Sequence, residues 1–167
     1  MVDEAYQLLT DIVNTGQYTE CARVAHETWR ATKEAQGWKY GKERSNEEKT
    51  NPLMLPFDEL PDEIKGLNSL TPYAVVNFIR TKEGKRTLHC LDELLKEMLD
   101  GKNGPLVQEM SEYVHSHFLV AQLPKGATPQ TRKDMIVYED LDQETQSWDT
   151  NSALEVIKYL RKRLIQQ

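Results

Sequence analysis

Apolar residues recur at three- and four-residue steps along most of the chain, and proline or glycine interrupts this pattern where a helix would end. The clearest segments predict helices over residues 4–14, 19–36, 87–100 and 105–121. Thr19 is suited to cap the second helix, and Gly37 can adopt the left-handed conformation that often ends one. Gly101 is expected to stop the third helix, and Pro105 opens the fourth. The pattern therefore predicts a mainly α fold.

Less regular segments connect these helices. A polar connection over residues 41–52 leads to residues 53–66, LMLPFDELPDEIKG, which have the pattern of an extended segment entering a short helical turn. Thr71 and Pro72 are suited to the cap and first position of a following helix. Residues 123–134 predict a loop, and Thr150 or Asn151 is expected to begin the last helix.

The chain also resembles itself. Shifted by 81 positions, residues 53–80 align with residues 134–161 without a gap. The matched positions include Phe57 with Tyr138, Leu60 with Leu141, Glu63 with Glu144, and Leu67 with Trp148. Upstream, a shift of 89 aligns VAHETW with YVHSHF and places His26 over His115 and Trp29 over Phe118. The eight-residue difference falls in the connection between the blocks, where insertions are tolerated, so we interpret the chain as two diverged copies of one unit.

Composition narrows the class of protein. With 167 residues, 38% hydrophobic and 29% charged, the chain is typical of one compact globular domain, and it has no apolar run of membrane-spanning length. The acidic start lacks the features of a secretory signal, so we expect a cytoplasmic protein. The formal charge of −6 argues against binding to duplex nucleic acid. Cys21 and Cys90 lack the spacing of a metal site or disulfide framework and are interpreted as core residues.

Recognisable catalytic motifs are missing from the sequence. It contains no glycine-rich phosphate loop, serine elbow or zinc-binding helix motif. His115 and His117 are two residues apart, and His89 adjoins Cys90, so on a helix neither pair shares a face. FDELPDEIKG is acidic but lacks the ligand spacing of a helix-loop-helix calcium site. We therefore expect a non-enzymatic protein without a cofactor or metal.

Several short motifs occur in an order that resembles a known family. ARVAHETW, GWKYG, Lys49 and NPLMLPFDELPDEIKGLN, followed by an apolar helix, are similar to the repeat of ryanodine receptors, the RyR domain, over residues 22–80. Residues 111–161 resemble a second, degenerate repeat without a GWKYG equivalent. The resemblance implies a small stand-alone protein of bacterial or phage type with two repeats, and the absence of a pore means that it does not imply calcium conduction. The predicted division is an N-terminal helix (1–18), a first repeat (19–86), a connecting helix (87–103) and a second repeat (104–167).

The stretch from Ala22 to Gly41 carries the candidate binding chemistry. His26 and Trp29 share a helix face, and a pseudo-twofold arrangement of the repeats would set Trp29 opposite Phe118 across a groove. Aromatic rings can stack on a nucleobase, and nearby cations can bind phosphates. The predicted ligand-binding residues are Arg23, His26, Trp29, Arg30, Lys33, Trp38, Tyr40, Lys49, His115 and Phe118.

The same residues also have structural interpretations. Trp29, Trp38 and Tyr40 are also suited to core packing, and His26 to a hydrogen bond with a backbone carbonyl. Arg23 with Glu27, and Arg30 with Glu34, have the spacing of ion pairs on a helix face. We predict a sensor or sequestering protein for a nucleotide or nucleotide-derived signal. The alternative is a structural or interaction module without a small-molecule ligand, whose C-terminal helix packs on a second copy or on a signalling-protein partner.

Overall fold

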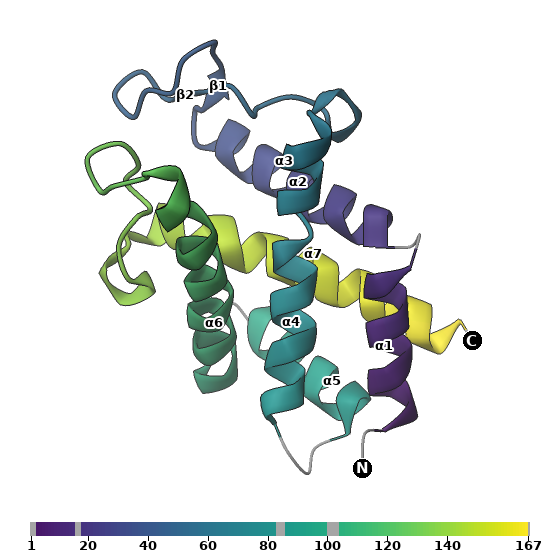
Figure 1. Cartoon of the computed structure of the whole chain (residues 1–167). Helices are drawn as coiled ribbons and strands as arrows, with labels where there is room; N and C mark the ends of the chain where they lie inside the picture. The colour runs from purple at the N-terminus through teal and green to yellow at the C-terminus, as the bar shows by residue number, and fades with distance from the viewer. Residues whose placement is uncertain (1–2, 16–17, 83–85, 100–103, 167) are drawn as a thin grey trace.

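The computed structural model describes residues 3–15, 18–82, 86–99 and 104–166 (Figure 1). Its α-helices are α1 (Glu4–Asn14), α2 (Tyr18–Ala35), α3 (Asp62–Leu67), α4 (Leu70–Thr81), α5 (Thr87–Leu99), α6 (Pro105–Gln122) and α7 (Gln143–Ile165). Short 3₁₀ turns cover Phe57–Glu59, Leu123–Lys125 and Tyr138–Asp140, and two-residue strands lie at β1 (Lys39–Tyr40) and β2 (Thr50–Asn51). The predicted mainly α fold is confirmed.

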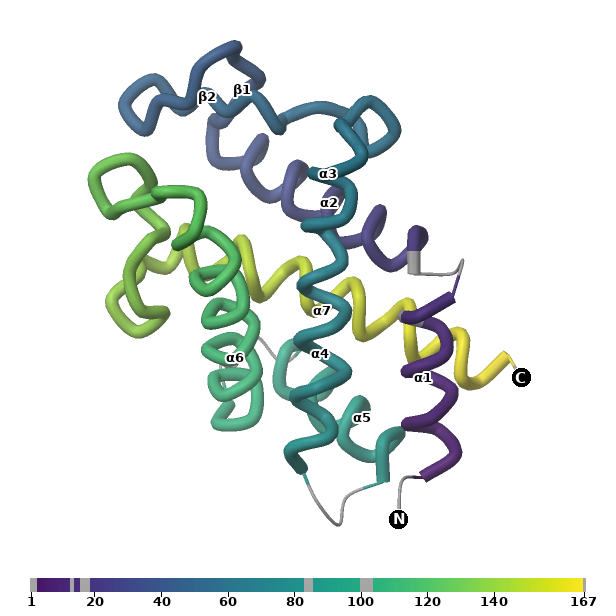
Figure 2. Tube along the Cα trace, in the orientation of Figure 1, coloured from purple at the N-terminus to yellow at the C-terminus, as the bar shows by residue number. Residues whose placement is uncertain are grey.

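Helix α7 lies at the centre of the fold. It contacts α1, α2, α4, α5 and α6, and it crosses the molecule as the yellow segment in Figure 2. Its residues Ala153, Val156, Ile157 and Leu160 are all fully buried, and their three- and four-residue spacing places them on one face. This face joins the main core, which also takes in buried residues of α1, α2, α4, α5 and α6. No described helix combines the length and apolar character that a membrane crossing requires.

The two halves of the chain place equivalent elements in the same order. A long helix (α2 or α6) is followed by a 3₁₀ turn at Phe57–Glu59 or Tyr138–Asp140, offset by the 81 positions of the sequence alignment. The residues that end these turns have nearly identical backbone angles, φ −72° and ψ 147° at Leu60 against φ −71° and ψ 144° at Leu141. The first half continues into α3 and α4, which are separated at residues 68–69, whereas α7 runs unbroken through the equivalent positions.

Several predicted helix ends differ from the structure. The prediction that α7 begins at Thr150 or Asn151 is wrong, because Asp142 accepts a 2.8 Å hydrogen bond from the Thr145 backbone N–H and caps a helix that starts at Gln143. No proline or glycine lies between these starts to interrupt that earlier helix. Helix α2 begins at Tyr18 rather than after Thr19, and α4 begins at Leu70, so Thr71 and Pro72 lie within its first turn. Residue 100 and the predicted stop at Gly101 lie outside the described residues.

The connection after α2 folds over the C-terminal end of that helix. Gly37 has φ +90°, which is the left-handed conformation predicted for it. β1 and β2 pair in parallel, with Lys39 opposite Thr50. A Cβ atom at Gly41 would lie 2.5 Å from the Cβ of Thr50, so this close approach requires glycine. Lys49 donates from Nζ to the Gln36 carbonyl at 2.7 Å, which fixes the loop of residues 41–49 above the helix end.

Candidate ligand-binding site

His26 and His115 make the same main-chain contact in the two halves of the chain. The Nε2 atom of His26 lies 2.7 Å from the Leu55 carbonyl oxygen, and Nε2 of His115 lies 2.7 Å from that of Ile136. The two accepting residues are separated by the same 81 positions as the aligned segments. Because a carbonyl oxygen only accepts, each imidazole carries its proton on Nε2. Each histidine therefore ties its helix to the extended segment that follows.

Aromatic rings surround both histidines in matching geometry. His26 lies 5.5 Å from Trp29 and 6.1 Å from Phe57 between ring centroids. His115 lies 5.7 Å from Phe118 and 6.1 Å from Tyr138. The sequence alignment pairs Trp29 with Phe118 and Phe57 with Tyr138, so the aligned residues make matching contacts.

The two histidines differ in the residue that faces Nδ1. Asp149 places its Oδ2 2.9 Å from Nδ1 of His115, whereas Asn68 is the equivalent residue beside His26. Burial lowers the pKa of His26 below its usual value. Burial also acts to lower the pKa of His115, but the hydrogen bond and charge of Asp149 outweigh that effect and raise it. Burial raises the pKa of Asp149 as well. With Nε2–H already donating to Ile136, the proton that the pair gains lies in the hydrogen bond between Nδ1 and Asp149.

We therefore expect the two histidines to titrate on opposite sides of the ordinary histidine pKa. NMR titration of the ring Hε1 signals should give a pKa above 6.5 for His115 and below 6.5 for His26. The variant Asn68→Asp should raise the pKa of His26, because it places a carboxylate where His115 has one. An unchanged His26 titration in a folded Asn68→Asp variant would contradict this account of the pair.

A partly open cavity of about 130 Å³ lies between the two halves of the chain. We call it the interrepeat cavity. Its lining includes residues that are equivalent in the sequence alignment: Ala25 and Val114, His26 and His115, Trp29 and Phe118, Ile64 and Thr145, Leu67 and Trp148, and Asn68 and Asp149. This volume is close to the roughly 150 Å³ of an apolar cavity that holds one benzene molecule. The repeats therefore enclose a ligand-sized space with an aromatic ring contributed by each.

Polar side chains form part of the cavity lining. The buried hydroxyl of Thr145 lies beside the Asp142 carboxylate that caps α7, and its interaction with that carboxylate lowers the pKa of Asp142. Asn68 and the two histidines also line the cavity, together with Arg132, Asp134 and Asp149. A few polar groups set among apolar and aromatic side chains are usual for small-molecule sites.

Lys33 lies in an aromatic cage behind this lining. Its Nζ is 3.7 Å from the ring centroid of Trp38, 3.8 Å from Trp148 and 5.0 Å from Trp29. The side chain is 2% exposed and makes no hydrogen bond or ion pair with a described residue. Burial lowers the pKa of Lys33 to about 7, while the ring faces favour the ammonium form. Trp38 and Lys33, both predicted to touch a ligand, thus support Trp29 and Trp148 from behind.

The other predicted binding residues lie away from the cavity lining. Arg23 pairs with Asp58 at 2.8 Å and with Glu20 at 3.4 Å, and Arg30 pairs with Glu27 at 2.8 Å and with Glu34 at 4.0 Å. The predicted pair of Arg23 with Glu27 is not formed, because Glu27 accepts from the Phe57 backbone N–H at 2.8 Å instead. Tyr40 is 52% exposed, and Lys49 caps α2. Of the ten predicted residues, His26, Trp29, His115 and Phe118 line the cavity.

Sequence reasoning missed several residues of the lining. Arg132 and Asp134 reach it from the segment before the Tyr138 turn, with Arg132 donating to Asp134 from Nε at 3.1 Å and from an Nη at 3.2 Å. The internal alignment could have identified Asp149 and Trp148 as lining residues, because it pairs them with Asn68 and Leu67 of the first repeat. Arg132 lies in a predicted loop, and in a loop the spacing of apolar residues does not indicate which way a side chain points.

The remaining histidines and cysteines form no metal site. Among the described residues, no cluster of three or more potential ligands is close enough to hold an ion. His117 faces its own helix, with Nδ1 3.0 Å from the Tyr113 carbonyl, and does not line the cavity. Cys21 and Cys90 are buried and are not joined in a disulfide.

Comparison with protein families gives one match. Residues 8–85 match the family model of the RyR domain, and this range covers the second half of α1 together with α2, the strand pair, α3 and α4. The match includes the first of the two histidine units and ends before the second. A comparison with curated proteins gave no match.

Proposed function

Because residues 8–85 match the family model of the RyR domain, we propose that the chain is a non-enzymatic ligand-binding module, and that a nucleotide or nucleotide-derived signal binds in the interrepeat cavity. The observation that carries this proposal is the cavity itself, with Trp29 and Phe118 in its lining. The volume of about 130 Å³ is close to that of a cavity that holds one aromatic ring, so it has the size class of a heterocyclic base. Stacking on aromatic side chains contributes roughly 1–3 kcal/mol per base.

The polar lining suits the edge of a base. Asn68 offers an amide, Thr145 a hydroxyl, and His115 with Asp149 a hydrogen-bonded pair at the cavity wall. Sites that hydrogen-bond the edge of a ligand discriminate strongly against analogues that leave those groups unpaired. We therefore expect the protein to distinguish between bases rather than to bind any flat molecule.

The alternative is a structural or interaction module, for which the C-terminal helix is the predicted contact. Ile165 is 58% exposed, beside a shallow hollow lined by Leu95 and residues of α7. That proposal leaves the interrepeat cavity without a role. The partly open cavity between the repeats therefore favours the ligand-binding proposal.

Thermal unfolding against a ligand panel tests the proposal. The panel comprises adenine and guanine nucleotides, ADP-ribose, NAD, and cyclic mono- and dinucleotides. At 100 times the dissociation constant, a bound ligand adds about 2.7 kcal/mol, which raises the unfolding temperature by roughly 5–10 °C for a chain of this size. We expect one or a few compounds to give this rise.

Two variants locate the effect. Trp29→Ala should lose most of the rise while staying folded, whereas Tyr40→Ala, which removes an exposed aromatic ring outside the cavity lining, should keep it. Unfolding temperatures that no compound changes would overturn the nucleotide proposal. A rise that persists in Trp29→Ala would place the ligand elsewhere.

A further inference from the structure

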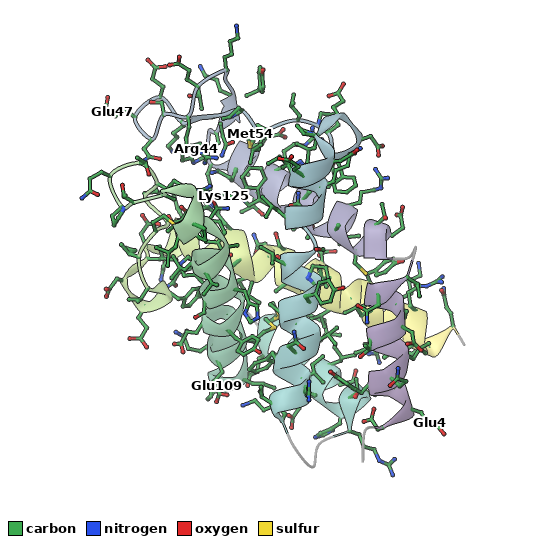
Figure 3. All side chains as sticks on the ribbon, viewed as in Figure 1. Glu4, Arg44, Glu47, Met54, Glu109 and Lys125 are labelled. Carbon is green, nitrogen blue, oxygen red and sulfur yellow. The ribbon has the colours of Figure 1, made fainter. Side chains whose placement is uncertain are left out.

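Arg44 forms no direct ion pair with a described acidic side chain. It lies in the loop of residues 41–49, and Figure 3 shows it on the side of that loop that faces the segment after α6. The side chain is only partly exposed and forms no hydrogen bond or ion pair with a described residue. Burial, together with the nearby charge of Arg132, lowers the pKa of Arg44 to about 10. A partly buried guanidinium without a partner is unfavourable unless a ligand supplies the negative charge.

Basic side chains of both repeats lie close together around Arg44. Lys33 interacts electrostatically with both Arg44 and Arg132, so three basic side chains from different segments share one region. Asp134 is the carboxylate that interacts with all three, and both of its oxygens already accept hydrogen bonds from Arg132. Lys133 is engaged elsewhere, because its Nζ lies 3.5 Å from Asp142. One carboxylate therefore faces an excess of cations.

The cationic region adjoins the interrepeat cavity. Arg132 lines the cavity, and its guanidinium carbon lies 5.0 Å from the ring centroid of Phe118. Lys33 reaches the back of Trp29, the aromatic ring that the first repeat contributes to the lining. A group bound between Arg44 and Arg132 would consequently be within reach of a ring stacked in the cavity.

We propose that Arg44 and Arg132 form an anion subsite that binds a phosphate group of the ligand, one arginine coming from each repeat. This inference rests on the proposed function, because it assigns the base to the interrepeat cavity and the phosphate to its cationic border. A phosphate monoester carries close to two negative charges and offers several acceptor oxygens, which match the forked donors of arginine. The ligand class is then a nucleoside phosphate rather than a free base or nucleoside.

Paired ligands test the subsite. Adenosine and AMP, and guanosine and GMP, are titrated calorimetrically into the full chain and into Arg44→Gln. Hydrogen bonds to charged groups contribute about 1.5–3 kcal/mol, so the wild type should bind the monophosphate roughly 10- to 100-fold more tightly than its nucleoside. Arg44→Gln should lose most of this preference and keep the nucleoside affinity. Lys42→Gln is the matched control, since it removes an exposed cation from the same loop and should keep the preference.

The outcomes distinguish a failure of the anion subsite from a failure of base binding in the cavity. Equal affinity of the wild type for nucleoside and monophosphate would overturn the subsite and leave the base cavity standing. A preference that survives in Arg44→Gln as fully as in Lys42→Gln would also overturn it. If none of the four compounds binds, both the anion subsite and the proposal that adenine or guanine binds in the interrepeat cavity are overturned. If Arg44→Gln does not fold, Arg44→Lys replaces it and should retain only part of the preference, because lysine keeps the charge and loses the fork.

Discussion

Replacing Trp148 by alanine should lower the free energy of unfolding by about 3–5 kcal/mol, which is typical for the loss of a large aromatic side chain from a core. Trp148 is 5% exposed and donates from Nε1 to the Gln36 side-chain oxygen at 2.7 Å. It packs edge to face against Trp38, with ring centroids 5.7 Å apart. Because Trp38 and Gln36 follow α2 and Trp148 lies in α7, this one side chain joins the two halves of the chain.

Trp148→Ala should also destabilise the buried ammonium form of Lys33. The indole ring lies 3.8 Å from Lys33 Nζ, and its removal takes away one of the faces that favour the buried ammonium. Urea-induced unfolding monitored by circular dichroism measures the change in free energy. Leu99→Ala is the control, because that side chain is 66% exposed and its truncation should change stability by less than about 0.5 kcal/mol. A loss below about 1 kcal/mol for Trp148→Ala would mean that Trp148 does not hold the repeats together.

Replacing Leu67 by tryptophan should abolish ligand binding without unfolding the protein. Leu67 lines the interrepeat cavity at the position equivalent to Trp148, and it is only partly buried, so a larger ring has room to enter the cavity. Filling that space removes the volume a base would occupy. The rise in unfolding temperature given by the best ligand of the panel should disappear, which corresponds to at least about a 100-fold loss of affinity.

The fold of Leu67→Trp is checked by its unfolding temperature without ligand. Overpacking costs typically 1–3 kcal/mol, so a moderate decrease is expected. Val137→Trp is the matched control, because it adds an indole at an exposed position outside the cavity lining and should leave binding intact. A Leu67→Trp variant that binds as tightly as the wild type would show that the ligand does not occupy the cavity.

The sequence predicted the parts of this protein that local pattern determines. α1 has the predicted bounds, Gly37 has the predicted conformation, and the shifts of 81 and 89 positions bring together His26, His115, Trp29 and Phe118 in one cavity lining. These predictions succeed because helical periodicity and a duplicated sequence both leave a readable trace in the order of residues.

Contacts between the repeats were not predictable in the same way. The cage of Lys33 requires Trp148, which is remote in sequence, and the turn after Gly37 that returns Trp38 to the helix. The sequence leaves both a ligand contact and a helix-face ion pair open for Arg23 and Arg30, and in the structure both pair with acidic side chains near them. Composition gives the number of charges, whereas the fold decides which charges neutralise one another. Arg44 and Arg132 are distinguished only by where the loops place them.

The measurement that most directly tests the central claim is an NMR titration of the four histidine rings with the ligand that gives the largest rise in unfolding temperature. His26 and His115 line the interrepeat cavity, whereas His89 and His117 do not, so one spectrum contains both the probes and their controls. We expect the Hε1 signals of His26 and His115 to move together and saturate at one equivalent of ligand, while those of His89 and His117 stay in place. Movement confined to His89 or His117, or no movement while the protein is stabilised, would contradict binding between the repeats.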